Sequence, residues 1–239
     1  DPLWSRGLGD VYKRQVVTSA GIILIDTLYE YATEDAIIGG LTKLGLDPRQ
    51  VKYLIVSHGH GDHVGGAGLI QQRLNPRVIM GGPDWDGVLA SPRIPNKPKR
   101  DIIATDGQKV TLGDTTVTVY LTPGHTAGTL GFTFPVKDGN ATHTVAYWGG
   151  TGFNFPQSRA AFQTYIDSAQ RFSELAGAAG ADVLLSNHTA LDGSTTKMPD
   201  LKKRSSGAPH PYVVGKDSVS RYLRVAQNCA SVMLLKQTQ

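Results

Sequence analysis

Four side chains that can bind a metal ion lie close together in the segment 57–63, whose sequence is Ser-His-Gly-His-Gly-Asp-His. The glycines at positions 59 and 61 allow the backbone to turn sharply, so we expect a loop and not a helix. In such a loop His58 and His60 can project to the same side, whereas the adjacent Asp62 and His63 must point apart. One metal ion cannot easily bind all four side chains. The spacing therefore predicts two metal ions, the first bound by the histidine pair and the second by the Asp62–His63 pair.

Each metal ion needs a further ligand, because catalytic zinc sites use three protein ligands and keep a fourth position open for water. Two other histidines follow apolar strands: His125 in the sequence Pro-Gly-His-Thr and His188 in the sequence Ser-Asn-His. Alone, either would more often be a core or loop histidine, but beside the dense 58–63 cluster both become candidate ligands. Imidazole dominates this ligand set, which favours zinc over iron or manganese. His143 and His210 lack such context and are interpreted as surface or supporting residues.

Short apolar runs between glycines, prolines and polar turns predict the elements that must carry these side chains. We expect strands at Val16–Thr18, Ile22–Asp26, Val51–Ser57, Arg77–Met80, Lys109–Leu112, Thr115–Leu121, Thr129–Phe134, Thr142–Trp148 and Asp182–Ser186. We expect helices at Thr33–Leu44, Leu69–Leu74, Trp85–Leu89, Ser158–Leu175 and Ser218–Leu235. Each half of the chain thus runs from strands to a helix and then to a buried strand. This order suggests two sheets packed against each other with the helices outside.

The composition limits the class of protein. The chain has 239 residues, of which 40% are apolar and 18% charged, and this excludes a disordered chain or a coiled coil. No apolar run approaches the roughly 20 residues of a membrane-spanning helix, so no membrane partner is expected. The formal net charge of +4 is too small to indicate a nucleic-acid partner. The single cysteine, Cys229, excludes an intramolecular disulfide and is expected to be a small buried hydrophobic residue.

Two basic clusters and the N-terminus leave alternatives open. The clusters at 93–100 and 197–204 are interpreted as solvated loops or, alternatively, as a basic rim that attracts an anionic substrate. Residues 1–15 contain neither an initiator methionine nor an apolar signal sequence. We interpret them as non-native sequence in place of the true N-terminus and any signal peptide, or as a flexible N-terminal arm. A single domain is expected to occupy residues 16–239.

The motif His58-Gly-His60-Gly-Asp62-His63, followed by Pro-Gly-His125-Thr and Asn-His188, resembles the metallo-β-lactamase superfamily. The Ile-Asp-Thr run at 25–27 and the helix after the glycine pair 65–66 also match, so the resemblance covers residues 16–239. It implies an α/β fold, an αββα sandwich of two mixed β-sheets with outer helices, N-terminally truncated in this chain. It also implies a metal site at one edge between the two sheets.

The segment 146–152, Ala-Tyr-Trp-Gly-Gly-Thr-Gly, narrows the resemblance. Glyoxalase II-like hydrolases, lactonases, phosphodiesterases and nucleases of the superfamily place a metal-bridging aspartate there, and other β-lactamases use a cysteine ligand; this chain has neither. The remaining similarity is to class B, subclass 3 metallo-β-lactamases, which implies two Zn²⁺ per chain. The implied ligands are His58, His60 and His125 for one ion and Asp62, His63 and His188 for the other. That subclass usually carries serines near this stretch to hold the β-lactam carboxylate, where this chain has Gly150, Thr151 and Gly152.

The resemblance implies a di-zinc hydrolase that opens the amide bond of β-lactams through a hydroxide formed at zinc. Asp62 would bind zinc, orient the hydroxide and handle its proton. The alternatives are a related hydrolase acting on a lactone, ester or thioester, and a metal-binding scaffold without activity. The expected partner is a small-molecule substrate, and the oligomeric state is left open. Enzymes of this subclass, which confer antibiotic resistance, are usually secreted or periplasmic, and the same location is expected here.

The segment 149–156 is expected to line the substrate cleft, because it joins a strand to a helix at the position where the subclass binds the substrate carboxylate. Thr151 is the candidate polar contact, and Phe153 or Phe155 is the candidate apolar wall. The alternative is that both phenylalanines belong to the core, where phenylalanine is common.

Overall fold

The computed structural model describes residues 14–237 of the chain. The prediction for residues 1–15 therefore falls mostly on residues outside the described part, and it stays a prediction there. Arg14 and Gln15 are described, and both are buried residues of the first strand, β1 (Arg14–Thr18). These two residues therefore belong to a strand, and the expected domain boundary at residue 16 stays a prediction.

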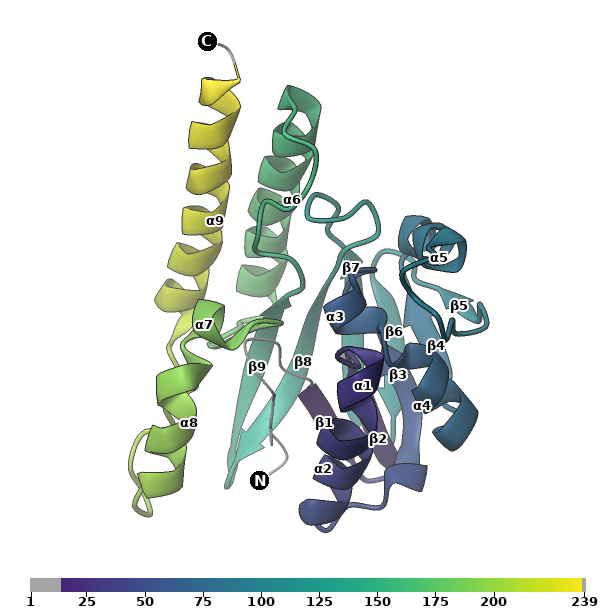
Figure 1. Ribbon diagram of the computed structural model, residues 1–239. Coiled ribbons are helices and arrows are strands. Elements are labelled where there is room, and N and C mark those ends of the chain that lie inside the picture. Colours follow the sequence, from purple (N-terminus) through teal and green to yellow (C-terminus); the bar gives the residue numbers. More distant parts are fainter. Residues whose placement is uncertain (1–13, 238–239) are drawn as a thin grey trace.

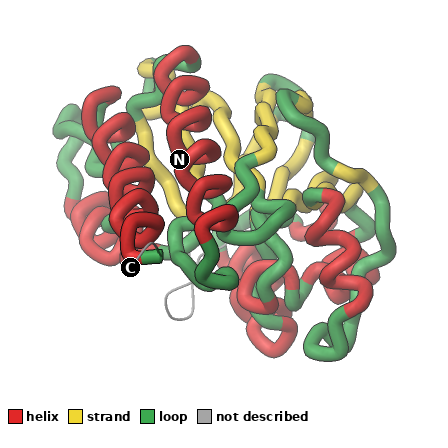
Figure 2. Tube along the Cα trace, turned by 90° about the horizontal axis from the view of Figure 1, so that it is seen from above, coloured by secondary structure: helices red, strands yellow, loops and turns green. Residues whose placement is uncertain are grey.

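Two five-stranded sheets form the centre of the molecule (Figures 1 and 2). The N-terminal sheet contains, in spatial order, β1, β2 (Gly21–Ile25), β3 (Val51–Ile55), β4 (Arg77–Met80) and β5 (Ile102–Ile103). The C-terminal sheet contains β10 (Val183–Ser186), β9 (Ala141–Trp148), β8 (Leu130–Asp138), β7 (Thr115–Leu121) and β6 (Gln108–Leu112). Both sheets are mixed, because β1 runs antiparallel to β2 in the first and β10 runs parallel to β9 in the second.

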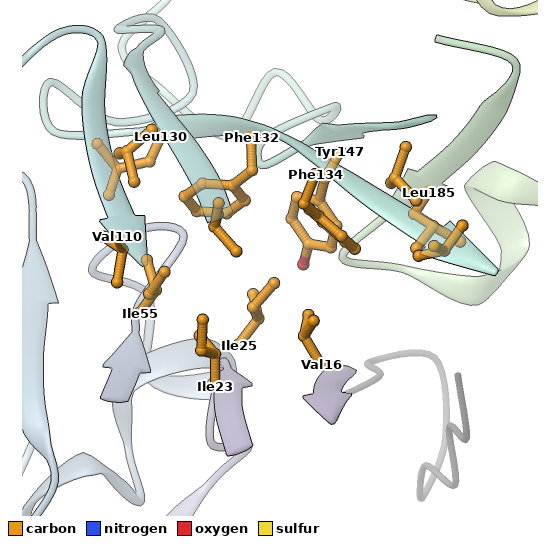
Figure 3. Packing of buried hydrophobic residues seen from close by; sticks show 14 of the residues in the cluster. Val16, Ile23, Ile25, Ile55, Val110, Leu130, Phe132, Phe134, Tyr147 and Leu185 are labelled. Carbon is orange, nitrogen blue, oxygen red and sulfur yellow. The ribbon is translucent and has the colours of Figure 1, made fainter. Parts of the chain in front are cut away.

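The two sheets bury one shared apolar layer between their inner faces (Figure 3). The N-terminal sheet contributes Val16, Ile23, Ile25 and Ile55, and the C-terminal sheet contributes Phe132, Phe134, Tyr147 and Leu185. Alternate residues of a strand point to opposite faces of its sheet, so Ile22 and Leu24 of β2 instead face a second cluster under the helices. This alternation is why each sheet can contact the other sheet and a helical layer at once.

Helices cover the outer face of each sheet. Over the N-terminal sheet lie α1 (Glu30–Thr33), η1 (Glu34–Ile38), α2 (Gly39–Lys43), η2 (Pro48–Gln50), α3 (Gly61–Val64), α4 (Ala67–Leu74) and α5 (Gly82–Ala90). The C-terminal sheet is covered by α6 (Arg159–Ala178) and α9 (Lys216–Lys236), which lie side by side, and α7 (Thr189–Asp192) and α8 (Ser194–Lys203) follow β10. The expected αββα sandwich is confirmed.

Two local expectations are wrong. Cys229 is exposed on α9, because the buried positions of that helix around it are Ala226 and Ala230. The short helices α7 and α8 were not expected, since their polar sequence shows no apolar periodicity, and Pro199 lies inside α8. Within residues 14–237 no helix is both long enough and apolar enough to cross a membrane.

Candidate metal centre

The segment after β3 carries the histidine-rich motif, and it is a loop only as far as His60. At Gly61 the one-turn helix α3 begins, so the expectation of a loop throughout is wrong. Neither Gly59 nor Gly61 has a positive φ. A Cβ atom at Gly59 would lie 3.3 Å from Asp84, and one at Gly61 would lie 3.3 Å from the Tyr29 ring. These glycines therefore permit close packing of neighbouring side chains, and the turn itself does not require their conformational freedom.

Three imidazoles converge beside this loop: those of His58, His60 and His125. The Nε2 atom of His125 lies 3.1 Å from Nε2 of His58 and 3.1 Å from Nδ1 of His60. The Nδ1 atom of His125 donates to the carbonyl oxygen of Gly152 at 2.6 Å, which leaves Nε2 as the free ring nitrogen. This set is called the first triad below.

The first triad fits a zinc ion by its chemistry and spacing. Zinc–nitrogen bonds of 2.0–2.1 Å in a tetrahedral site place neighbouring ligand nitrogens roughly 3.3 Å apart. The two 3.1 Å separations around His125 are close to that value. Burial lowers the pKa of all three histidines, that of His125 to about 4, so their rings are uncharged near neutral pH and each has one unprotonated nitrogen. The first triad can therefore bind a metal without first losing a proton.

Asp62, His63 and His188 form a second triad. The Nε2 atom of His63 lies 3.3 Å from Oδ2 of Asp62, and Nε2 of His188 lies 3.9 Å from the same oxygen. The expectation that Asp62 and His63 point apart is wrong, because α3 curls the backbone so that both side chains reach one point. Buried Nε2 of His63 has no hydrogen-bond partner among the described residues. An orphaned buried nitrogen facing a carboxylate and a second imidazole fits a metal ligand.

The two triads lie next to each other. The ring centroids of His58 and His63, one from each triad, are 4.1 Å apart. The structure thus brings together the same two sets of side chains that the sequence sorted, and both sets lie where loops leave β3, β7 and β10.

The carboxylate of Asp26 holds the second triad in position through His63. This buried residue has a φ of +63°, and its carboxylate accepts from the Ser57 backbone N–H at 2.7 Å and from the Ser57 hydroxyl at 2.8 Å. It also accepts from Nδ1 of His63 at 3.0 Å and from the Tyr147 hydroxyl at 3.2 Å. The bond to Nδ1 turns Nε2 of His63 toward Asp62. A ligand histidine held by a carboxylate in this way is a common support of metal sites.

Asp84, near the start of α5, supports the first triad. Its Oδ2 atom accepts from the backbone N–H of Gly59 at 2.6 Å and from the Thr126 hydroxyl at 2.7 Å, and its Oδ1 atom accepts from the backbone N–H of Gly128 at 3.0 Å. Gly59 separates His58 from His60, and Thr126 follows His125. One buried carboxylate therefore joins the two loops that carry the first triad. Burial raises the pKa of Asp84, and these hydrogen bonds oppose that shift.

The electrostatics of the second triad differ from those of the first. Burial lowers the pKa of His63, but the nearby negative charges of Asp26 and Asp62 and the hydrogen bond to Asp26 outweigh it and raise that pKa to about 9. Burial raises the pKa of Asp62, but the nearby positive charge of His63 outweighs it and lowers that pKa to about 2. A metal entering the second triad must therefore displace a proton from His63.

The packing around Gly149 and Gly150 explains why neither an aspartate nor a serine occupies these two positions. A Cβ atom at Gly149 would lie 2.0 Å from the carbonyl oxygen of Leu130, and one at Gly150 would lie 2.4 Å from Cβ of His125. Neither position admits a side chain, because Gly149 lies against the backbone of Leu130 and Gly150 lies against the side chain of His125. A larger residue at either position requires a different course of the chain.

Thr151 and Phe153, the expected substrate contacts, lie close to the triads but face inward. The Thr151 hydroxyl is 3.1 Å from the Tyr222 hydroxyl and 3.4 Å from that of Ser186. The Phe153 and Phe155 rings pack edge-on against Phe162 of α6, so both are partly buried additions to the core under that helix. Their contact with substrate stays a prediction.

Sequence reasoning missed Asp84 and Asn187. The Nδ2 atom of Asn187 donates to the carbonyl oxygen of Gly149 at 2.7 Å and lies 3.4 Å from Nδ1 of His58. Both residues have buried polar side chains beside glycine-rich loops. Burial is what distinguishes such a residue from an ordinary surface residue, and the sequence alone does not show burial. The sequence signal available for Asp84 was its place in the first turn of a helix that follows a buried strand.

Known proteins are similar to this chain in sequence and in fold. The sequence profile of the metallo-β-lactamase superfamily matches residues 16–139. Over 79 residues, 33% of this chain, the sequence is 38% identical to a hydroxyacylglutathione hydrolase of Pseudomonas putida, and over 111 residues it is 27% identical to one of Gloeothece citriformis. The matched parts span 26% and 39% of the length of those two relatives.

Solved structures match the whole fold. BJP-1, a subclass B3 metallo-β-lactamase of Bradyrhizobium japonicum, superimposes with a TM-score of 0.83 at 25% identity and covers 100% of this chain and 92% of its own. The native metallo-β-lactamase FEZ-1 of Legionella gormanii superimposes with a TM-score of 0.86 at 25% identity and covers 100% of this chain and 94% of its own. Subclass B3 enzymes are therefore similar to this chain over its whole length.

Proposed function

Since the chain belongs to the metallo-β-lactamase superfamily of hydrolases, we propose that it is a di-zinc hydrolase that opens the amide bond of β-lactams. The observation that carries this proposal is the pair of adjacent three-residue ligand sets, with His58 and His63 4.1 Å apart at their ring centroids. His58, His60 and His125 would hold one zinc ion, and Asp62, His63 and His188 would hold the other. Similarity over the full chain to two subclass B3 metallo-β-lactamases supports the choice of substrate.

The chain's own residues prepare the site for hydrolysis. When bound, zinc lowers the pKa of water to roughly 7 and polarises a carbonyl oxygen. Asp26 and Asp84 hold the ligand-bearing loops in place, so the ligands are positioned before substrate arrives. Asp62 has a carboxylate that stays ionised, with a pKa near 2, and it is the group of the second triad that can accept a proton from attacking water.

A second candidate function is hydrolysis of a thioester. The observation that favours it is the local similarity to hydroxyacylglutathione hydrolases, which is higher in identity than the similarity to BJP-1 and FEZ-1. It covers 33% of this chain, however, and lies against only 26% of the relative. Gly149 and Gly150 oppose this candidate, because a bridging aspartate finds no space at either position.

A panel of hydrolase substrates tests both candidates. Purified protein at saturating zinc is assayed with nitrocefin, an acyl-homoserine lactone, a simple aryl ester and a hydroxyacylglutathione, each with and without a chelator. Chelator-sensitive opening of nitrocefin as the fastest reaction is the expected result. Faster thioester cleavage favours the second candidate, and zinc binding with no turnover of any substrate contradicts both.

We also propose export to the periplasm or the medium and a contribution to antibiotic resistance, following the similarity to subclass B3 enzymes. The checks are the fraction in which the natural full-length protein accumulates and the β-lactam tolerance of cells that express it. Retention in the cytoplasm contradicts the export proposal.

A further inference from the structure

A cavity of about 700 Å³ opens beside the first triad, and nothing in the proposed reaction uses it. His60 and Gly61 form one wall of this cavity, Tyr29 and Tyr31 form a second, and Arg93 and Ile94 from the segment after α5 form a third. A volume of this size accommodates a drug-sized molecule. Because a candidate zinc ligand lines the cavity, a molecule bound there can reach the metal centre.

Tyr29 and Tyr31 form an exposed aromatic surface in this cavity. Their rings stack with centroids 5.6 Å apart and an angle of 11° between their planes. Tyr31 is 83% exposed and Tyr29 is 48% exposed, although large aromatic side chains usually lose most of their exposure on folding. Neither hydroxyl makes a hydrogen bond among the described residues. Two stacked, solvent-facing rings favour contact with a further planar or apolar group.

Arg93 supplies an unpaired positive charge to the same cavity. Its guanidinium makes no ion pair and no hydrogen bond within the part of the chain that the structure describes. The nearby basic residue Arg100, by contrast, is paired with Asp86. Glu30 also lines the cavity, and its carboxylate accepts from Nδ2 of Asn96 at 3.2 Å. Arg93 is thus available to a carboxylate of a ligand through a charge-assisted hydrogen bond.

Segment 149–151, the other candidate position for that carboxylate, offers few donors. The Thr151 hydroxyl is already engaged with Tyr222, and neither Gly149 nor Gly150 has space for a hydroxyl-bearing side chain. Within segment 149–151 only Thr151 carries a donor side chain, and its hydroxyl already contacts that of Tyr222, whereas Arg93 and His60 line the same cavity.

We propose that the cavity lined by Tyr29, Tyr31 and Arg93 is the substrate-recognition site, and that it selects organic anions that carry an aromatic ring. The proposal deepens the proposed function and rests on it for the reaction, but the binding preference can be measured without turnover. It also separates the two candidate functions. A β-lactam with an aryl side chain offers both a carboxylate and a ring, whereas a glutathione thioester offers carboxylates without a ring.

Three small probes test the proposal on the metal-loaded protein: benzenesulfonate, methyl phenyl sulfone and methanesulfonate. Sulfonates coordinate zinc weakly, so binding reports mainly on the cavity, and ligand-observed NMR titration gives each Kd. Benzenesulfonate should bind most tightly. In Arg93→Gln its Kd should rise about fivefold with that of the neutral sulfone unchanged, as expected for loss of one exposed charge pair. In Tyr31→Ala the Kd values of both ring-containing probes should rise about threefold.

Two matched variants control for general effects. Arg221→Gln removes an exposed arginine of α9 whose side chain hydrogen-bonds Ser218 and no other residue of the described part of the chain, and it should leave every Kd unchanged. Glu30→Gln removes the negative charge from the cavity and should tighten benzenesulfonate. The proposal is wrong if benzenesulfonate fails to bind, if it binds no more tightly than the sulfone, or if Arg93→Gln behaves like Arg221→Gln.

A kinetic arm distinguishes failure of this proposal from failure of the proposed function. The ratio of KM for an aryl-substituted anionic substrate to KM for 4-nitrophenyl acetate should rise about fivefold in Arg93→Gln, with little change in kcat. If the protein opens no β-lactam but the probe pattern holds, only the proposed function fails. If it opens β-lactams while the KM ratio stays constant, the recognition site is wrong and the hydrolase is right.

Discussion

The Nδ1 atom of His63 lies 3.0 Å from Oδ2 of Asp26, a carboxylate that comes from the turn after β2. This contact fixes the ring orientation and leaves Nε2 directed at Asp62. Replacing Asp26 by Asn should therefore weaken zinc binding at the second triad by about 10- to 100-fold, the usual cost of losing such a support. Competition with a chromophoric chelator measures this loss, and Asp217→Asn on exposed α9 is the matched control. Equal zinc affinity in the two variants contradicts the assigned role.

Asp84 should matter for the first triad in the same way. Asp84→Ala leaves the N–H groups of Gly59 and Gly128 without their acceptor, at a cost of about 1–3 kcal/mol for each buried group. We expect weaker zinc binding at the first triad and a lower melting temperature, with Asp84→Asn intermediate because it keeps one acceptor oxygen. Cobalt substitution followed by absorption spectroscopy reports on each site, and a change confined to the second triad refutes this prediction.

Zinc affinity should depend on pH at the second triad and much less at the first. The pKa of His63 is raised to about 9, so below that pH a proton must leave before zinc binds. The apparent zinc affinity of the second triad should therefore fall about tenfold for each pH unit below 9. The pKa of His125 is lowered to about 4, so the first triad has no proton to lose near neutral pH. Calorimetry in two buffers of different ionisation enthalpy counts the protons released. If zinc binding at the second triad releases no proton, the prediction is wrong.

Asp62→Asn separates metal binding from proton transfer. The amide oxygen can still coordinate zinc, but it cannot accept a proton at neutral pH, where Asp62 is ionised. We expect kcat to fall by about 100-fold or more with a smaller change in zinc content. Both quantities are measured on the same sample at saturating zinc. A variant that keeps both zinc ions and nearly normal kcat eliminates the proton role.

Gly150→Ser places a serine in the stretch where the family resemblance implies a carboxylate-binding hydroxyl, but it should harm this protein. Its Cβ atom would lie 2.4 Å from Cβ of His125, so the imidazole must move and the first triad should lose zinc affinity by at least about tenfold. Gly152→Ser is the matched control, because its Cβ atom would contact only the Asn154 side chain, at 3.1 Å. Tighter binding of a β-lactam by Gly150→Ser at full zinc content would show that the clash is relieved.

Much of this protein follows from local sequence. The continuous apolar run Ile22–Ile25 and the nearly continuous apolar run before Ser57 predict buried strands, because a strand covered on both faces needs apolar residues throughout. The spacing of His58, His60, Asp62 and His63 identifies a metal-binding segment, since few other roles need four such ligands in six residues. These features are local, so a single chain displays them without any knowledge of contacts.

What only the tertiary structure decided depends on residues far apart in the chain. Asp26 meets His63 and Tyr147, and Asp84 meets Gly59 and Gly128, across separations that no local pattern encodes. The convergence of Asp62 and His63 requires the helical turn α3. The sequence did not predict this turn, because Gly59 and Gly61 favoured a loop. The proposed recognition cavity likewise depends on packing, because Tyr31, from the segment after β2, and Arg93, from the segment after α5, line it together only in the folded chain.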